Sequence, residues 1–100
     1  MKNATFAPLY CGLYPELAEL ARKHGYALAI HGSLQRDFDL ICIPWVNNAS
    51  SPDDVVKDIT SNFSLNLRGD PDTVEHGRIR YTLVISFGEC FIDLSFMPRK

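Results

Sequence analysis

Apolar side chains recur at helical spacing in the segment between Pro15 and Gly25. Proline is favoured in the first turn of a helix, and glycine is favoured directly after the last turn. The pattern therefore predicts a helix from Pro15 to His24, preceded by an irregular lead-in over residues 1–14.

A second helix is predicted to begin at Pro52. Ser51 suits the N-cap position, proline suits the first helical position, and two acidic residues follow in the first turn. The apolar positions of this helix form one stripe, made up of Val55, Val56, Ile59 and Phe63.

Four segments have the short apolar runs or the strict alternation that predict strands. The predicted strands are Tyr26–Ile30, Asp37–Pro44, the alternating stretch Ile79–Ile85, and Cys90–Met97. The polar segment Asn66–Gly77 contains two glycines and a proline and is predicted to be a loop.

The predicted elements follow one another as helix, strand, strand, helix, strand, strand. One hundred residues correspond to a single domain, residues 1–100, with no internal repeat or linker. The economical architecture is an α+β fold in which a mixed sheet of about four strands is covered by two helices.

Composition narrows the classes of protein to which the chain can belong. With 46% hydrophobic and 22% charged residues, it can bury a core. The net charge of −2 provides no basic surface, so a nucleic-acid partner is not indicated. The chain lacks a membrane-spanning run and a signal-peptide pattern, so we expect no membrane association and a cytoplasmic location. Its three cysteines contain no C-x-x-C pair, which favours buried free thiols in a reducing compartment.

Three aspartates give the strongest chemical signal. Asp37 and Asp39 are two residues apart at the start of a predicted strand, so both side chains lie on the same face. Asp93 lies within the apolar run of the last strand, where an unpaired charge is costly. If the two strands are neighbours, the three carboxylates converge and provide the oxygen ligands that Mg²⁺ or Mn²⁺ prefers.

Simpler roles for these residues remain open. Asp37 can be a solvated turn residue, with Asp39 hydrogen-bonded to Ser33 or to backbone N–H groups. Asp93 can lie on an edge strand and pair with Arg78 or Arg80.

The order of these residues resembles a known family. A Gly-Ser pair after a strand, an Asp-x-Asp pair leading into the next strand, and a later aspartate resemble the polymerase-beta-type nucleotidyltransferase superfamily, in particular its minimal nucleotidyltransferase domains. The resemblance implies that Gly32 and Ser33 hold nucleotide phosphates. It also implies that Asp37 and Asp39 bind Mg²⁺ or Mn²⁺. Asp93 would then complete the metal site and help to activate a hydroxyl acceptor.

The segment from His31 to Trp45 also resembles small uncharacterised bacteriophage proteins, which would place the chain in the host cytoplasm. That second resemblance implies no activity.

One departure from the nucleotidyltransferase pattern concerns phosphate binding. Only three residues separate Ser33 from Asp37, too few to present a helix N-terminus to the phosphates. Arg36 can replace that device as a direct phosphate ligand. Arg78 and Arg80 share one face of their strand and are further candidates for phosphate binding.

Three functions follow as hypotheses. The first is Mg²⁺-dependent transfer of a nucleotidyl group from a nucleoside triphosphate to a hydroxyl. The second is a binding or regulatory module of the same fold without activity. So short a chain favours a protein partner that supplies missing elements, or loss of activity. The third is a zinc hydrolase that uses His31, Asp37 or Asp39, and His76.

Overall fold

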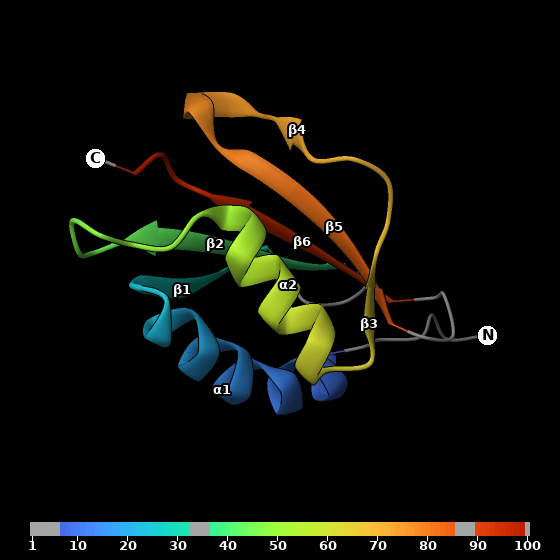
Figure 1. The fold of residues 1–100 in the computed structure, drawn as a ribbon. Coiled ribbons are helices and arrows are strands. Elements are labelled where there is room, and N and C mark those ends of the chain that lie inside the picture. Colours follow the sequence, from blue (N-terminus) through green and yellow to red (C-terminus); the bar gives the residue numbers. More distant parts are fainter. Residues whose placement is uncertain (1–6, 33–36, 86–89, 100) are drawn as a thin grey trace.

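The computed structural model describes residues 7–32, 37–85 and 90–99. Within these residues, two α-helices lie beside a mixed sheet of six strands, which confirms the predicted α+β class (Figure 1). In chain order the elements are α1 (Ala7–Lys23), β1 (Tyr26–His31), β2 (Asp37–Pro44), α2 (Pro52–Asn62), β3 (Leu65–Leu67), β4 (Asp72–Thr73), the short 3₁₀ helix η1 (Glu75–Gly77), β5 (Ile79–Ile85) and β6 (Phe91–Phe96).

The last strand of the chain lies in the middle of the sheet. The strand order is β1-β2-β6-β5-β3, and the short strand β4 pairs with the other end of β5. β2 and β6 are parallel, whereas the other strand pairs are antiparallel. Strands far apart in sequence, β2 and β6, are therefore direct neighbours.

The two faces of the sheet differ sharply in character. One face packs against both helices, and residues from α1, α2 and four strands meet there around a small internal space: Leu17, Ala21, Leu28, Leu40, Cys42, Ile59, Leu83, Ile92 and Leu94. Aromatic contacts extend this core, with Tyr10 stacked on Phe38 at 4.7 Å between ring centroids. The other face carries the alternate residues of each strand, and neither helix covers it. We call it the open face.

The prediction that the first helix begins at Pro15 is wrong, because α1 begins at Ala7 and Pro15 lies inside it. A proline in a helix interior costs about 3 kcal/mol. The first turns of α1 are nevertheless held by packing, since Tyr10 is fully buried against Phe38. Tyr14 adds a hydrogen bond from its hydroxyl to the carbonyl of Leu28, at 2.6 Å. Tertiary contacts thus outweigh the local signal.

The segment Asn66–Gly77 is not only a loop, as the sequence had suggested. Leu65–Leu67 and Asp72–Thr73 form the two short strands β3 and β4, both paired with β5. They were missed because two or three residues are too few to show periodicity, and pairing with β5 supplies their hydrogen bonds. Phe63 was predicted to belong to the apolar stripe of the second helix. It is instead the extended C-cap, because α2 ends at Asn62.

The cysteines are free thiols, but not all are buried: Cys42 and Cys90 are buried, whereas Cys11 is exposed on α1. No helix within the described residues is long and apolar enough to cross a bilayer.

Candidate functional site

One row of polar side chains crosses the open face of the sheet from β1 to β5. His31 on β1 is the register partner of Asp39 on β2, and Asp39 is the partner of Asp93 on β6. Asp93 is in turn the partner of Thr82 on β5. Because register partners on one face lie next to each other, the row places two carboxylates side by side between a histidine and a threonine.

The two carboxylates, here called the Asp39–Asp93 pair, perturb each other. Burial is the main cause that raises the pKa of Asp39, and the charge of Asp93 and hydrogen bonding to it raise that pKa further. Asp37 adds a weaker repulsion, and His31 acts in the opposite direction. Asp93 is fixed from its other side, because the Thr82 hydroxyl donates to its Oδ1 at 3.3 Å. A proton shared with Asp93, or a nearby cation, would therefore stabilise Asp39 in this position.

Gly32 forms the immediate wall beside Asp39. Its φ of 84° is in the left-handed region, and a Cβ built on it would lie 2.8 Å from Asp39 Oδ2. A side chain at this position would therefore push the carboxylate away from the pair. Glycine at this position therefore allows the backbone to approach Asp39 closely.

The Asp39–Asp93 pair opens into a cleft of about 500 Å³. The cleft floor is the open face, and Val74 and Glu75, which precede β5, also line the cleft. Its lining residues are His31, Asp39, Leu40, Ile41, Val74, Glu75, Arg78, Arg80, Asp93 and Ser95. The volume is within the range of small-molecule sites, and the lining combines three acids with two arginines.

Two of the three arginines predicted to bind phosphate, Arg78 and Arg80, line this cleft, but each already has protein partners. Arg80 binds Asp72 on β4 through two hydrogen bonds, of 3.2 Å from Nε and 2.7 Å from Nη2. Arg78 donates to Ser95 Oγ and to the carbonyl of Glu75, both at 3.2 Å. The alternative in which Asp93 lies on an edge strand is wrong, since β6 is central. The ion pair of Arg80 is formed with Asp72.

The remaining predicted site residues divide into two groups. Ser33 and Arg36 lie outside the described residues. Asp37 is exposed at the start of β2, on the same face as Asp39 and in register with Phe91. Nowhere in the described parts of the chain do three or more His, Cys, Asp or Glu side chains form a group that could hold a metal ion. The described site is thus a two-carboxylate arrangement, and the part of Asp37 in it stays a prediction.

The positions of the predicted zinc ligands do not support the zinc-hydrolase hypothesis. His76 lies in η1, exposed and with a left-handed φ of 64°, and it does not line the cleft that His31 lines.

Two polar strand residues of the site, Thr82 and Ser95, had no role assigned from the sequence. The alternation of β5 and β6 contained the signal, because Thr82 shares its face with Arg80 and Ser95 shares its face with Asp93. Neither role could be assigned without the register that brings the strands together.

The two carboxylates are sufficient protein ligands for a magnesium ion that also binds phosphates and water. Mg²⁺ keeps several water ligands and is usually held by one or two carboxylates together with substrate phosphates. Asp39 and Asp93 supply two carboxylates, and the two arginines lie in the same cleft. The donor set is therefore suited to an ion that arrives with a polyphosphate.

Comparison with known proteins adds no further constraint. No family model matches the chain, and no curated protein or solved structure shows a significant match to it.

Proposed function

We propose that the protein binds a divalent cation and the phosphates of a nucleoside triphosphate on the open face, and that it is a nucleotidyltransferase-like enzyme. The observation that carries this proposal is the register of Asp39 and Asp93 on adjacent parallel strands, inside a cleft that also contains Arg78 and Arg80. Two acids kept together beside a core are costly unless a cation offsets their repulsion.

The residues would divide the work by their chemistry. Asp39 and Asp93 would hold Mg²⁺ or Mn²⁺, which neutralises charge that develops on a phosphate during transfer. Arg80 would exchange Asp72 for a phosphate oxygen, and guanidinium groups suit phosphate through paired hydrogen bonds. Asp93, fixed by Thr82, would accept the proton of the attacking hydroxyl.

Metal binding is the first experiment. Titration with Mn²⁺, followed by electron paramagnetic resonance with and without a nucleoside triphosphate, is expected to show binding that the nucleotide strengthens. Asp93→Asn should weaken Mn²⁺ binding at least tenfold. Glu16→Gln is the matched control, because Glu16 is an exposed acid on α1, away from the open face. Equal Mn²⁺ binding in both variants would contradict the proposal.

Transfer itself separates the enzyme from a binding module of the same fold. Incubation with Mg²⁺, a nucleoside triphosphate and candidate hydroxyl acceptors is expected to release pyrophosphate. Binding of the nucleotide without pyrophosphate release would favour the second candidate, which the short Ser33–Asp37 spacing and the engagement of Arg80 by Asp72 support.

A further inference from the structure

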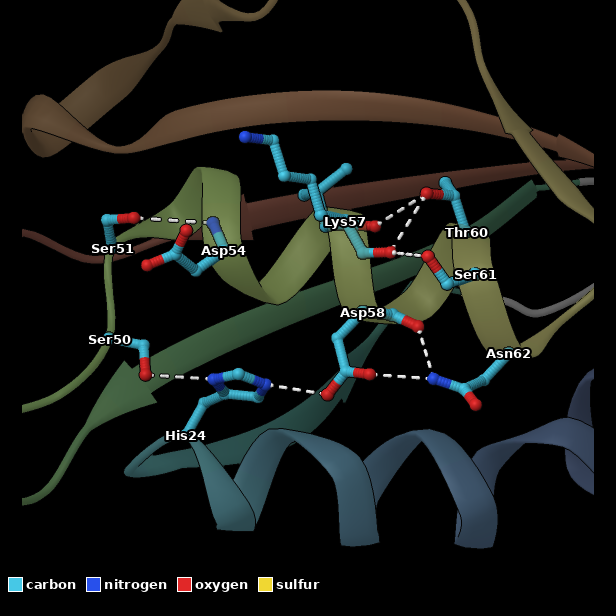
Figure 2. A network of polar contacts seen from close by, with 10 residues as sticks. His24, Ser50, Ser51, Asp54, Lys57, Asp58, Thr60, Ser61 and Asn62 are labelled. Carbon is cyan, nitrogen blue, oxygen red and sulfur yellow. Dashed lines mark hydrogen bonds and ion pairs between the residues drawn. The ribbon is translucent and has the colours of Figure 1, made fainter.

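A second group of polar residues lies where α1 ends, on the helix-covered side of the sheet. The imidazole of His24 is held between Ser50 and Asp58 (Figure 2). The distance from Nδ1 to Ser50 Oγ is 2.8 Å, and that from Nε2 to Asp58 Oδ2 is also 2.8 Å. A hydroxyl, an imidazole and a carboxylate are thus connected in one line.

The partners of His24 determine where its proton lies. An ionised carboxylate only accepts hydrogen bonds, so Nε2 must carry the proton that Asp58 receives. In the neutral ring Nδ1 then holds a lone pair, and the Ser50 hydroxyl must donate to it. This is the arrangement in which a base can take the proton of a serine nucleophile.

Further hydrogen bonds fix each member of the group. Asn62 Nδ2 donates to the second carboxylate oxygen of Asp58 at 2.6 Å, which orients that carboxylate toward the ring. The Ser50 N–H donates to the carbonyl of His24 at 2.9 Å, and the Tyr26 hydroxyl donates to the carbonyl of Ser50 at 2.7 Å. The side chain of His24 is only 19% exposed. The geometry is therefore set by its surroundings before any ligand binds.

An open surface pocket lies beside the serine and the histidine. It has a volume of about 200 Å³ and is lined by both Ser50 and His24, whereas Asp58 does not line it. Arg22 and Lys23, from the last turn of α1, also line it, together with the exposed ring of Trp45. The cavity is thus small, with two positive charges and an aromatic side chain in its wall, which suits a short ligand with a negative charge.

We propose that Ser50 and His24 form a second site that cleaves small esters carrying an anionic group. Ser50 Oγ forms a bond to the ester carbonyl carbon while its proton passes to His24 Nδ1. The bond from carbon to the alcohol oxygen then breaks, and that oxygen takes the proton from Nδ1. Water, activated in the same way, releases the acid and restores Ser50. Asp58 acts as a positioning residue that holds the tautomer of His24.

Covalent labelling tests this proposal directly and independently of the metal site. The intact protein is incubated with a fluorophosphonate probe, and the modified residue is identified by mass spectrometry. We expect one modified serine, Ser50, and no modification in Ser50→Ala. Ser61→Ala is the control, since Ser61 donates to the carbonyl of Lys57 on α2 and should label as the wild type does. A folded protein whose Ser50 stays unmodified would overturn the proposal.

The roles of His24 and Asp58 are tested by a measurement that does not depend on the thermal stability of the variants. Labelling rates are therefore compared well below the melting temperature of each variant. Asp58→Asn should slow the labelling of Ser50 at least tenfold, and Asp58→Glu should restore part of the rate. His24→Gln should abolish labelling. Equal rates in the wild type and in folded His24→Gln would mean that the three residues only fasten α1 to α2.

Ester specificity follows from the positive wall of the cavity. The 4-nitrophenyl monoester of glutaric acid is expected to be cleaved faster than 4-nitrophenyl acetate. Arg22→Gln should reduce this preference, because Arg22 lines the cavity and its only described ion pair is the exposed one with Glu19. No preference for the anionic ester would contradict the proposed substrate class.

Discussion

At the scale of single residues, the open face depends on how closely Asp39 approaches its neighbours. Burial and the adjacent Asp93 raise the pKa of Asp39, so the folded protein binds a proton there more readily than the unfolded chain does. Such a group contributes its full stability below the unfolded pKa and loses it as the pH rises through the folded pKa. Without a cation, the cost of Asp39 therefore grows from about pH 4 upward.

Asp39→Asn is expected to remove this cost. In the presence of EDTA, the melting temperature of the variant relative to the wild type should rise between about pH 4 and pH 7. We expect a gain of about 0.5 kcal/mol, or roughly 2–4 °C, because Asp39 is only partly buried. Thermal unfolding across this range gives the measurement. A variant less stable than the wild type at pH 7 would show that Asp39 is instead a structural acceptor.

Gly32→Ala is expected to act in the opposite direction. The new Cβ would lie 2.8 Å from Asp39 Oδ2 at a φ of 84°, so the variant should lose about 1–3 kcal/mol of unfolding free energy, together with Mn²⁺ binding. Gly12→Ala is the matched control, because nothing lies within 4 Å of a Cβ in that helical position. It should gain about 0.5–1 kcal/mol. Urea denaturation of both variants measures the contrast, and equal effects would contradict it.

At the scale of elements, sequence signals succeeded where the pattern was long and failed where a tertiary contact decided the outcome. The alternation from Ile79 to Ile85 and the N-cap at Ser51 predicted β5 and the start of α2, since both are local features. The start of α1 was missed because burial of Tyr10 extends the helix upstream of Pro15, where the local sequence signal had placed its beginning. The sequence predicted that Asp39 and Asp93 come together only if their two strands are neighbours. Strand order is a non-local property that spacing does not reveal.

Pro15→Ala tests how far packing offsets the proline in α1. Alanine restores an N–H donor at this position and removes a steric conflict with the preceding turn. We expect a gain of roughly 1–3 kcal/mol in unfolding free energy by urea denaturation. Pro8→Ala provides the comparison, because Pro8 lies in the first turn of α1, where the missing donor matters little. A similar change in both variants would mean that Pro15 imposes no local cost.

Strand β4 holds Arg80 away from a ligand through Asp72. Asp72→Asn should free the guanidinium and strengthen the binding of inorganic triphosphate in the presence of Mg²⁺ by roughly threefold, the range for an exposed ion pair. Isothermal titration calorimetry measures this affinity. Asp70→Asn, an exposed neighbour outside the cleft lining, serves as the control. Weaker triphosphate binding in Asp72→Asn would place Asp72 among the ligand-binding groups instead.

At the scale of the whole molecule, the core lies on one face of the sheet and the Asp39–Asp93 pair on the other. Phe96 at the end of β6 shows how the core is joined, because its ring meets Tyr26 and Tyr81 edge-on at centroid distances of 5.3 and 5.6 Å. Through Phe96 on β6, these contacts connect strand β1 with strand β5.

Phe96→Ala is therefore expected to weaken the entire domain. The loss should be about 3–5 kcal/mol of unfolding free energy, a large share of the total for a chain of this size. Phe63→Ala, at a half-buried position after α2, should cost clearly less. Amide hydrogen exchange should show faster exchange in β1 and β5 together for Phe96→Ala. Faster exchange confined to β6 would contradict a single cooperative core.

The central place of β6 also has a consequence for synthesis on the ribosome. As the chain emerges, β2 and β5 are complete before the strand that separates them exists, so each has an unpaired edge in the nascent chain. The sheet can close only after Phe96 has left the exit tunnel, and the Asp39–Asp93 pair forms at that moment. Folding of this sheet is thus delayed until β6 has been synthesised, and the interval before that is when chaperones would act on the unpaired edges.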